Sequence, residues 1–373
     1  MKGYYIFAPV EEGAAGQYSG IEKKIRNFCE ILGEEINITL DVLPPYEQGS
    51  SRIKRIFRRW MLWLPVGHDW NQFIGRYEGA DFIYIRKAEH DASFIRFLRK
   101  MKVQNPKIKI LYEIPTYPYE KEQRITFGNF PIFVKDRLFR RKLKKYVDRI
   151  VTFYNQPDIL GVPTICIMNG YNFSNIKPGA YHVEKDSINM IEVSTTAFWH
   201  GYDRVIEGLH NYYENNGTEN IVFHMIGPAM TEHKELVDKY GLQKHVIFYG
   251  KKSGSELDEI YKKCSIGIDV LGGHRKDYPI SSSLKSREYA EKGLPLITSS
   301  PVDYLPEKYK YQMICPYNDE PIDMNAVVDF HNSIFKNQSV EQVSRKIQEM
   351  AIEKCDFHVT LKPIVDYLNG EKE

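Results

Sequence analysis

Short runs of β-branched and aromatic residues alternate with segments of helical spacing along the whole chain. In the first half these runs predict strands at residues 4–10, 37–43, 81–85, 108–114, 149–153 and 164–168. In the second half they predict strands at 190–193, 222–226, 246–249, 266–271 and 294–298. Strands that alternate with helices pair in parallel, and helices cover both faces of the resulting sheet. The pattern therefore predicts an α/β protein with two doubly wound domains.

A break in this alternation marks the domain boundary between residues 172 and 187. The residues that interrupt it are Asn175, Pro178 and Gly179. We expect a first domain at 1–175 and a second at 176–355, which suits a chain of 373 residues. Residues 359–368 again have helical apolar spacing. We expect the segment 356–373 to form a helix that packs back on the first domain.

Formal charge is unevenly distributed, although the whole chain carries only +2. Residues 1–175 hold 28 Lys and Arg against 19 Asp and Glu, a balance of +9, and the remainder holds 23 against 30, a balance of −7. This polarity indicates an anionic partner for the first half, such as a membrane surface, nucleic acid or a phosphorylated ligand. A solvated basic face without a partner is the alternative.

The sequence also bears on the cellular compartment. It has no stretch of the roughly 18 apolar residues that a membrane-spanning helix needs. The first apolar run ends at Glu11 and Glu12 and is typical of a strand, not of a signal peptide. The five cysteines are scattered and form no Cys-x-x-Cys motif, so neither a disulfide framework nor a zinc site is indicated. We therefore expect a cytoplasmic protein.

The most informative segment is residues 281–295, Ser-Ser-Ser-Leu-Lys-Ser-Arg-Glu-Tyr-Ala-Glu-Lys-Gly-Leu-Pro. Its serines predict the start of a helix, and Gly293 predicts the end. The free N–H groups of the first turn, with Lys285 nearby, suit a phosphate. Glu288 lies on the same face and is placed to accept hydrogen bonds from ribose hydroxyls. The candidate binding residues are Ser282, Ser283, Leu284 and Glu288. A capped surface helix with an ion pair is the alternative.

This segment resembles the nucleotide-sugar motif of glycosyltransferase family 4, whose members are retaining enzymes of GT-B fold. Other blocks agree with the family in order and spacing over essentially the whole chain, among them Trp-His-Gly-Tyr-Asp-Arg. The blocks are residues 19–22, 112–119, 168–170, 199–204, 226–228, 249–250 and 265–269. The similarity is greatest to bacterial cell-surface polysaccharide glycosyltransferases. It implies two Rossmann-like domains facing across a cleft, which holds the active site.

Three positions depart from the family pattern. Where members carry the first Glu of a Glu-x7-Glu pair, this chain has Ile280. Where many members hold the diphosphate with an Arg and a Lys, it has Ser194 and His200. Other groups must then neutralise the negative charge of the diphosphate. The candidates are Lys285, the helix N-terminus, Arg204 and Arg287.

The first domain contributes candidates from loops after predicted strands. Glu113 lies in a loop with two prolines and three tyrosines, and the resemblance implies that it orients the acceptor or the reacting sugar. An ordinary loop carboxylate is the alternative. Ser19 and Gly20 precede a predicted helix, where a glycine lets the backbone approach a phosphate closely. A simple turn is the alternative there.

In the second domain, His200 precedes a predicted helix and could donate to a β-phosphate oxygen and titrate near neutral pH. A loop histidine satisfied by the backbone is the alternative. Tyr249 belongs to one of the family blocks and is a candidate substrate contact. The remaining histidines show no metal-ligand spacing, so no metal or other cofactor is expected.

Residues 52–64 interleave five cations with large apolar groups. At helical spacing one face collects Ile53, Ile56, Phe57, Trp60 and Leu64, which is typical of a helix lying in a membrane interface. A second basic run follows at 135–145. We expect peripheral contact with an anionic membrane at its inner face. A core-facing helix with a solvated basic face is the alternative, and no nucleic acid is expected because no reading motif accompanies the charge.

Together these features predict a retaining hexosyltransferase. It would move a hexose from a nucleoside diphosphate sugar, with a UDP-sugar favoured, to a glycan or polyprenyl-linked acceptor in polysaccharide or glycoconjugate biosynthesis. Its expected catalytic residues are Glu113, His200 and Lys285. Two alternatives stay open: a non-catalytic glycosyltransferase-like partner subunit and a nucleotide-sugar epimerase on the same fold.

Overall fold

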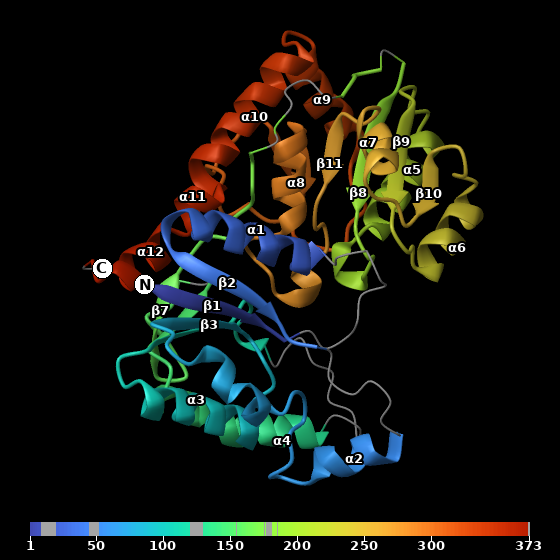
Figure 1. Ribbon diagram of the computed structural model, residues 1–373. Helices are drawn as coiled ribbons and strands as arrows, with labels where there is room; N and C mark the ends of the chain where they lie inside the picture. The colour runs from blue at the N-terminus through green and yellow to red at the C-terminus, as the bar shows by residue number, and fades with distance from the viewer. Residues whose placement is uncertain are drawn as a thin grey trace. The chain divides into compact units, whose positions relative to one another are not determined.

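The computed structural model describes residues 1–8, 20–44, 52–119, 130–153, 155–174, 176, 181–184 and 186–371. The chain divides into two compact units (Figure 1). The first comprises Met1–Gly170 and Phe357–Glu373, and the second comprises Tyr171–Asp356. Residues 171–175, which we expected in the first domain, therefore belong to the second unit.

The first unit contains a seven-stranded sheet with the order β2-β1-β3-β4-β5-β7-β6. Its strands are β1 (Lys2–Phe7), β2 (Asn37–Val42), β3 (Phe82–Arg86), β4 (Lys109–Glu113), β5 (Arg149–Thr152), β6 (Asp158–Ile159) and β7 (Val162–Cys166). The described pairings are parallel except that of β6 with β7. The central strands β3 and β4 are buried along most of their length, as their continuous apolar sequences predict.

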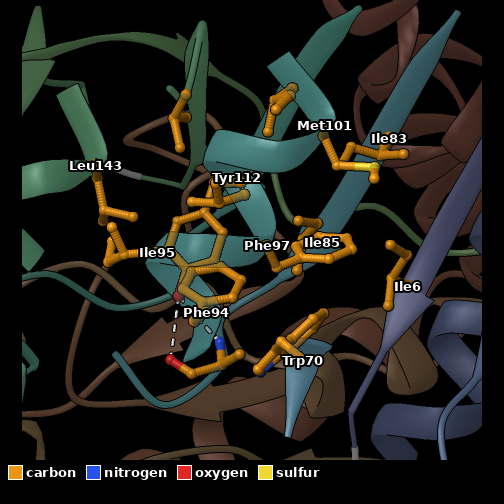
Figure 2. Close-up of a cluster of buried hydrophobic side chains, with 14 of the residues drawn as sticks. Ile6, Trp70, Ile83, Ile85, Phe94, Ile95, Phe97, Met101, Tyr112 and Leu143 are labelled. Atoms are coloured by element: carbon orange, nitrogen blue, oxygen red, sulfur yellow. Dashed lines mark hydrogen bonds between the residues drawn. The ribbon is translucent and has the colours of Figure 1, made fainter. Parts of the chain in front are cut away.

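Helices cover both faces of this sheet. They are α1 (Gly20–Glu35), α2 (Arg52–Trp60), the 3₁₀ helix η1 (Trp70–Tyr77), α3 (Ala92–Gln104), α4 (Phe130–Phe139), the 3₁₀ helix η3 (Arg140–Lys145), α11 (Phe357–Thr360) and α12 (Lys362–Asn369). On one face Phe28, Phe357 and Leu361 belong to one buried cluster. On the other face, η1 and α3 bring Trp70 and Phe94 onto the strands (Figure 2). The C-terminal helices therefore complete the core of the first unit.

The second unit contains a six-stranded parallel sheet with the order β10-β9-β8-β11-β12-β13. Its strands are β8 (Ile188–Val193), β9 (Ile221–Ile226), β10 (Val246–Gly250), β11 (Ile266–Ile268), β12 (Leu296–Thr298) and β13 (Gln312–Ile314). Every strand predicted from the sequence is present near its expected place. The short strands β6 and β13 were not predicted, because two or three residues are too few for a recognisable pattern.

The helices of the second unit form the outer layers of an α/β/α arrangement. They are the 3₁₀ helix η4 (Phe198–His200), α5 (Asp203–Glu214), α6 (Thr231–Tyr240), α7 (Ser255–Tyr261), the 3₁₀ helix η5 (Gly273–Lys276), α8 (Leu284–Lys292), α9 (Met324–Phe335) and α10 (Val340–Cys355). Val205 of α5 and Val327 of α9 pack in one core cluster with Ile266 and Ile268. Gly267 points to the opposite face, where a Cβ would meet the Tyr289 ring at 2.5 Å. Helix α8 therefore packs closely on β11.

Helix α8 is the helix that the serine-rich segment predicted, and its two ends are confirmed. Ser283 is the N-cap, and its Oγ accepts a hydrogen bond from the Ser286 backbone N–H at 3.2 Å. Gly293 closes the helix at φ 71°, in the left-handed region that glycine adopts readily.

No helix among the described residues is both long enough and apolar enough to span a membrane.

Candidate active site

The strand order of the second sheet contains a switch point beside β8. The chain runs from β8 to β9 and β10 on one side, and β11 then pairs with β8 on the other side. In open α/β sheets, ligands bind beyond the carboxyl ends of the strands at such a point. Glu192 lies near the end of β8 and Asp269 directly follows β11. Both acids therefore lie at the switch point.

The first turn of α8 supplies backbone donors. Its first N–H groups have no carbonyl partner within the helix, and the positive end of the helix dipole lies with them. The serine hydroxyls, in contrast, donate to buried or half-buried carboxylates. Ser283 Oγ donates to Asp269 Oδ1 at 2.7 Å, and Ser282 Oγ donates to Asp303 Oδ2 at 2.7 Å. Ser282 and Ser283 therefore shape the turn, and a ligand there would meet backbone N–H groups.

Lys285 is the cation of this site. Its ammonium donates to the Tyr202 hydroxyl at 2.8 Å and lies 3.9 Å from Asp269 Oδ1. Burial lowers the pKa of Lys285, while Asp269, Glu192 and Glu288 oppose that shift. The side chain keeps only 12% of its surface exposed, so its charge acts in a region of weak solvent screening.

Glu288 lies one turn further along α8 and is half-buried. Its charge raises the pKa of Tyr171 and Tyr261, in addition to the larger effect of burial, and opposes the lowering at Lys285. Lys285 and Glu288 thus lie three residues apart on α8, and the charge of Glu288 favours the protonated form of Lys285. The hydrogen bonds to ribose expected for Glu288 stay a prediction.

The sequence did not reveal the role of Glu192 at this site. Glu192 is fully buried, and Ser194 Oγ donates to its Oε2 at 2.7 Å. Within the described part of the chain its Oε1 has no hydrogen-bond partner. Burial raises the pKa of Glu192 to about 7, although Ser194 and Lys285 act against this rise. The available signal was that Glu192 is the single charged residue in the apolar run 188–193.

His200 does not titrate near neutral pH, so that expectation is wrong. Burial lowers the pKa of His200 to about 3, and the charges of Lys285 and Lys276 add to the effect. Its Nδ1 accepts a hydrogen bond from the Ala197 backbone N–H at 3.2 Å. A neutral imidazole that accepts at Nδ1 carries its proton on Nε2. His200 therefore keeps one ring donor that could serve a phosphate oxygen.

Both candidate arginines are engaged by other groups of the second unit. Arg204 is fully buried and donates to the carbonyl oxygens of Glu320 at 2.7 Å, Pro316 at 3.0 Å and Leu271. Arg287 is also fully buried and pairs with Asp303. Both guanidinium groups join loops to the body of the second unit. Their expected contacts with a diphosphate therefore stay a prediction without support from these hydrogen bonds.

Tyr249 is also engaged within the protein. Its hydroxyl lies 2.9 Å from His224 Nδ1, and His224 Nε2 lies 2.9 Å from Asn189 Oδ1. Tyr249 itself lies on β10 at the edge of the sheet, two strands away from β8. Its expected contact with substrate therefore stays a prediction without support from these hydrogen bonds.

Glu113 is the last residue of β4 and only 2% exposed, so it is not the loop carboxylate that the sequence predicted. It accepts hydrogen bonds from the hydroxyls of Tyr84 at 2.8 Å and Tyr5 at 3.0 Å, and pairs with Arg86. Burial alone raises its pKa, but Arg86, Lys24 and the two tyrosines lower it below the usual value. Glu113 therefore ties β1, β3 and β4 together, and we assign it a structural role.

The other candidates of the first unit fall at the start of α1. Gly20 is the first residue of that helix. Ser19 lies outside the described residues.

Comparisons with known proteins concern the second unit and the architecture of the chain. Residues 176–302 match the family model described as Glycosyl transferases group 1. That range contains Glu192, Lys285 and Glu288. The match therefore lies within the second unit. The chain matches no curated protein by sequence.

Solved structures share the architecture of the whole chain. Alr3699/HepE from Anabaena, in complex with UDP and glucose, is 11% identical, with 99% of each chain covered and a TM-score of 0.59. Sucrose-phosphate synthase from Thermosynechococcus elongatus is 12% identical, with 99% of each chain covered and a TM-score of 0.61. An alpha-glucosyltransferase in complex with UDP and a 13-mer DNA is 11% identical, with 99% of each chain covered and a TM-score of 0.63. The fold is GT-B. The predicted fold class is thus confirmed.

Proposed function

We propose that this glycosyltransferase moves a hexose from a nucleoside diphosphate sugar to a glycan acceptor, with retention at the anomeric carbon. The observation that carries the proposal is the site at the switch point. The buried ammonium of Lys285 and the free N–H groups of α8 converge there, with Glu288 one turn beyond. A pyrophosphate followed by a ribose matches this order of donors and acceptor.

The donors of this site act on the leaving group. The bond between the anomeric carbon and the diphosphate oxygen breaks through an oxocarbenium-like transition state, and the acceptor hydroxyl oxygen bonds to that carbon. The hydroxyl proton passes to the leaving phosphate. Negative charge develops on the diphosphate as the bond breaks, so fixed donors such as Lys285, the α8 N–H groups and His200 Nε2 lower the barrier.

Removal of Glu288 tests the donor site. Glu288→Ala should weaken the binding of nucleotide sugars, because the ribose loses its acceptor. A thermal-shift panel of nucleotide sugars, with a UDP-sugar expected to stabilise most, identifies the ligand and measures the loss. Glu349→Ala, at an exposed position of α10, is the matched control. Equal stabilisation of wild type and Glu288→Ala by the best ligand would show that the donor site is wrongly placed.

The acceptor is proposed to be a polyprenyl-linked glycan at an anionic membrane. Two exposed apolar faces of the first unit support this choice. Helix α2 and the residues after it expose Ile56, Phe57, Trp60, Leu62 and Trp63, and α4 exposes Phe130, Val134 and Leu138. Lys135 joins the two, since its ammonium donates to the carbonyl oxygens of Arg58 and Leu64 at 2.9 and 2.8 Å. Exposed arginines and lysines flank α4, among them Arg137, Arg141 and Lys142.

We also propose that the reaction needs no metal ion. Lys285, His200 Nε2–H and the helix N-terminus would take the part that a divalent cation plays in other phosphate chemistry. Addition of a chelator should leave the rate of sugar transfer unchanged. Loss of activity with chelator, restored by a divalent cation, would contradict this.

A non-catalytic partner subunit is a second candidate, because Ser194 and His200 occupy the places of the family's Arg and Lys and both nearby arginines are engaged. Slow hydrolysis of the donor by the purified chain separates the two. An active transferase hydrolyses its donor slowly without acceptor, whereas a non-catalytic subunit binds it and leaves it intact. An epimerase would instead release an isomerised nucleotide sugar.

A further inference from the structure

Three ionisable side chains meet at the switch point of the second sheet. Glu192 comes from β8, Asp269 from the end of β11 and Lys285 from the first turn of α8. Glu192 and Asp269 are fully buried, and the Lys285 side chain is 12% exposed. When Glu192 is ionised the three groups carry a net charge of −1, and when it is protonated they carry none. The protonation of Glu192 therefore decides whether this cluster repels an anion.

The surroundings of Glu192 contain several polar and ionisable groups. Those that face it or Lys285 from the packed elements are Ser194, His200, Tyr202, Asp269, Glu288 and Tyr289. Asp269 accepts hydrogen bonds from the hydroxyls of Ser281 at 3.0 Å and Ser283 at 2.7 Å. Glu192 accepts a hydrogen bond from Ser194 Oγ on Oε2, and the Tyr202 hydroxyl also favours its ionised form. Among the described residues nothing donates to its Oε1, so Glu192 is the acid of this cluster that is least stabilised as an anion.

We propose that Glu192 is a proton-linked positioning residue, which takes up one proton from solvent when a pyrophosphate group binds beside Lys285. The inference rests on the proposed function. In the free protein, ionised Glu192 and Asp269 together offset the charge of Lys285. Once the carboxyl of Glu192 is protonated, the attraction of Lys285 for a bound anion is no longer cancelled. No covalent bond changes, and the proton passes from water or buffer to the carboxylate oxygen.

The direction of the coupling follows from elementary electrostatics. Burial already raises the pKa of Glu192 to about 7. An added anion nearby disfavours the carboxylate and raises that pKa further. Linkage then requires binding to draw in protons at any pH between the free and bound pKa values. Affinity for the diphosphate should therefore fall as the pH rises above about 7.

Isothermal titration with UDP-glucose, or with the nucleotide sugar that stabilises most in the panel, tests this directly. The two phosphates of a nucleotide sugar are diesters and do not titrate near neutral pH, so uptake reports on the protein. The number of protons taken up is the slope of the observed binding enthalpy plotted against the ionisation enthalpy of the buffer. We expect close to one proton per ligand near pH 8 and almost none near pH 5.5.

The Glu192→Gln variant sharpens the test, because glutamine has the shape of the neutral acid and cannot titrate. It should take up no proton and should bind about tenfold more tightly than wild type near pH 8, with equal affinity near pH 5.5. Glu235→Gln, at an exposed position of α6, is the matched control and should behave as wild type.

The outcomes separate this inference from the function on which it rests. Binding of a nucleotide sugar without proton uptake near pH 8, or uptake retained in Glu192→Gln, would overturn the role of Glu192 and leave the donor site intact. Binding of no nucleotide sugar at either pH would overturn both. The wild-type measurement decides the matter even if Glu192→Gln does not fold.

Discussion

At the scale of single residues, burial separates charges that serve the fold from charges that serve the site. Arg204, Arg287 and Glu113 are buried, and each is held by several partners. Lys285 donates to the Tyr202 hydroxyl, and Asp269 Oδ1 lies 3.9 Å from its ammonium. A cation with few partners in a poorly screened place can respond to a ligand, whereas a fully satisfied one cannot.

Glu192 also makes stability depend on pH in the absence of ligand. Its pKa is raised from the usual value of 4.5 to about 7, so between these values the folded state binds more protons than the unfolded state. The resulting stability is complete below about pH 4.5 and is lost as the pH rises through about 7, by about 3 kcal/mol in all. Urea unfolding of the second unit near pH 5.5 and pH 8 should show this fall in wild type and a smaller one in Glu192→Gln. An equal fall in both proteins would mean that Glu192 titrates normally.

For Glu113 we predict an effect on stability without an effect on ligand binding. Glu113→Gln removes the charge that pairs with Arg86 and should destabilise the first unit by about 3–5 kcal/mol, as expected when a buried ion pair loses one partner. The dissociation constant for the nucleotide sugar should not change, because that site lies on the second unit. Thermal unfolding and ligand titration measure the two effects. Glu30→Gln, exposed on α1, is the control. Unchanged stability together with lost turnover would restore the catalytic role.

Local features of these residues could be predicted from the sequence, whereas their long-range partners could not. Composition and spacing predicted a serine cap, a lysine and a glutamate on one helix, because these three positions lie within a few residues of one another in the sequence. The partners of Glu113 cannot be predicted in this way, since Tyr5 precedes it by 108 residues and Tyr84 by 29. The same holds for His200, whose low pKa depends on burial and on Lys285.

At the scale of elements, α8 is fixed by its C-terminal glycine. Gly293 has φ 71°, and a Cβ there would lie 2.5 Å from the Ser344 Cβ of α10. Gly293→Ala should therefore destabilise the second unit by more than the roughly 1–2 kcal/mol of a left-handed alanine alone. Gly241 ends α6 at φ 67° with nothing within 4 Å of its Cβ position. Gly241→Ala should show only the backbone cost, and equal losses in the two variants would disprove the close packing.

Helices α2 and α4 predict membrane binding that can be separated from folding. Phe57 is 56% exposed and Trp63 is 68% exposed, so Phe57→Ser with Trp63→Ser should leave the core intact. The double variant should float poorly with liposomes that contain anionic lipid, since it loses the two most exposed of these apolar side chains. Val103→Ser, at an equally exposed apolar position of α3, is the control. Charge reversal at Arg55, Arg58 and Arg59 should also abolish flotation. Flotation of both variants like wild type would remove the membrane proposal.

The elements were easier to predict than their contacts. Runs such as 82–85 and 110–112 are continuously apolar because helices cover both faces of a parallel sheet. The amphipathic pattern of residues 52–64 gave a helix, observed as α2 over Arg52–Trp60. The sequence did not reveal that α4 exposes a second apolar face, because its apolar and basic residues do not follow a clear helical period.

At the scale of the whole molecule, the chain enters the second unit once and returns to the first for its last residues. Helices α11 and α12 complete one face of the first sheet, where Phe357, Leu361 and Ile364 are 2% exposed or less. Truncation of one such side chain to alanine costs about 2–5 kcal/mol. The free-energy cost of removing the whole segment therefore exceeds the free energy of unfolding of a typical domain. The first unit is therefore built from two separate stretches of the chain, whereas the second unit is one continuous stretch.

Deletion of residues 357–373 should consequently unfold the first unit and leave the second folded. Limited proteolysis should then degrade the first unit and release a resistant fragment that begins near Tyr171. The fragment should still be stabilised by the nucleotide sugar, since Glu192, Lys285 and Glu288 all lie within it. Phe357→Ala is the milder companion and should destabilise the first unit by about 3–5 kcal/mol without loss of nucleotide binding. Loss of nucleotide binding in the resistant fragment would show that the donor site needs residues of the first unit.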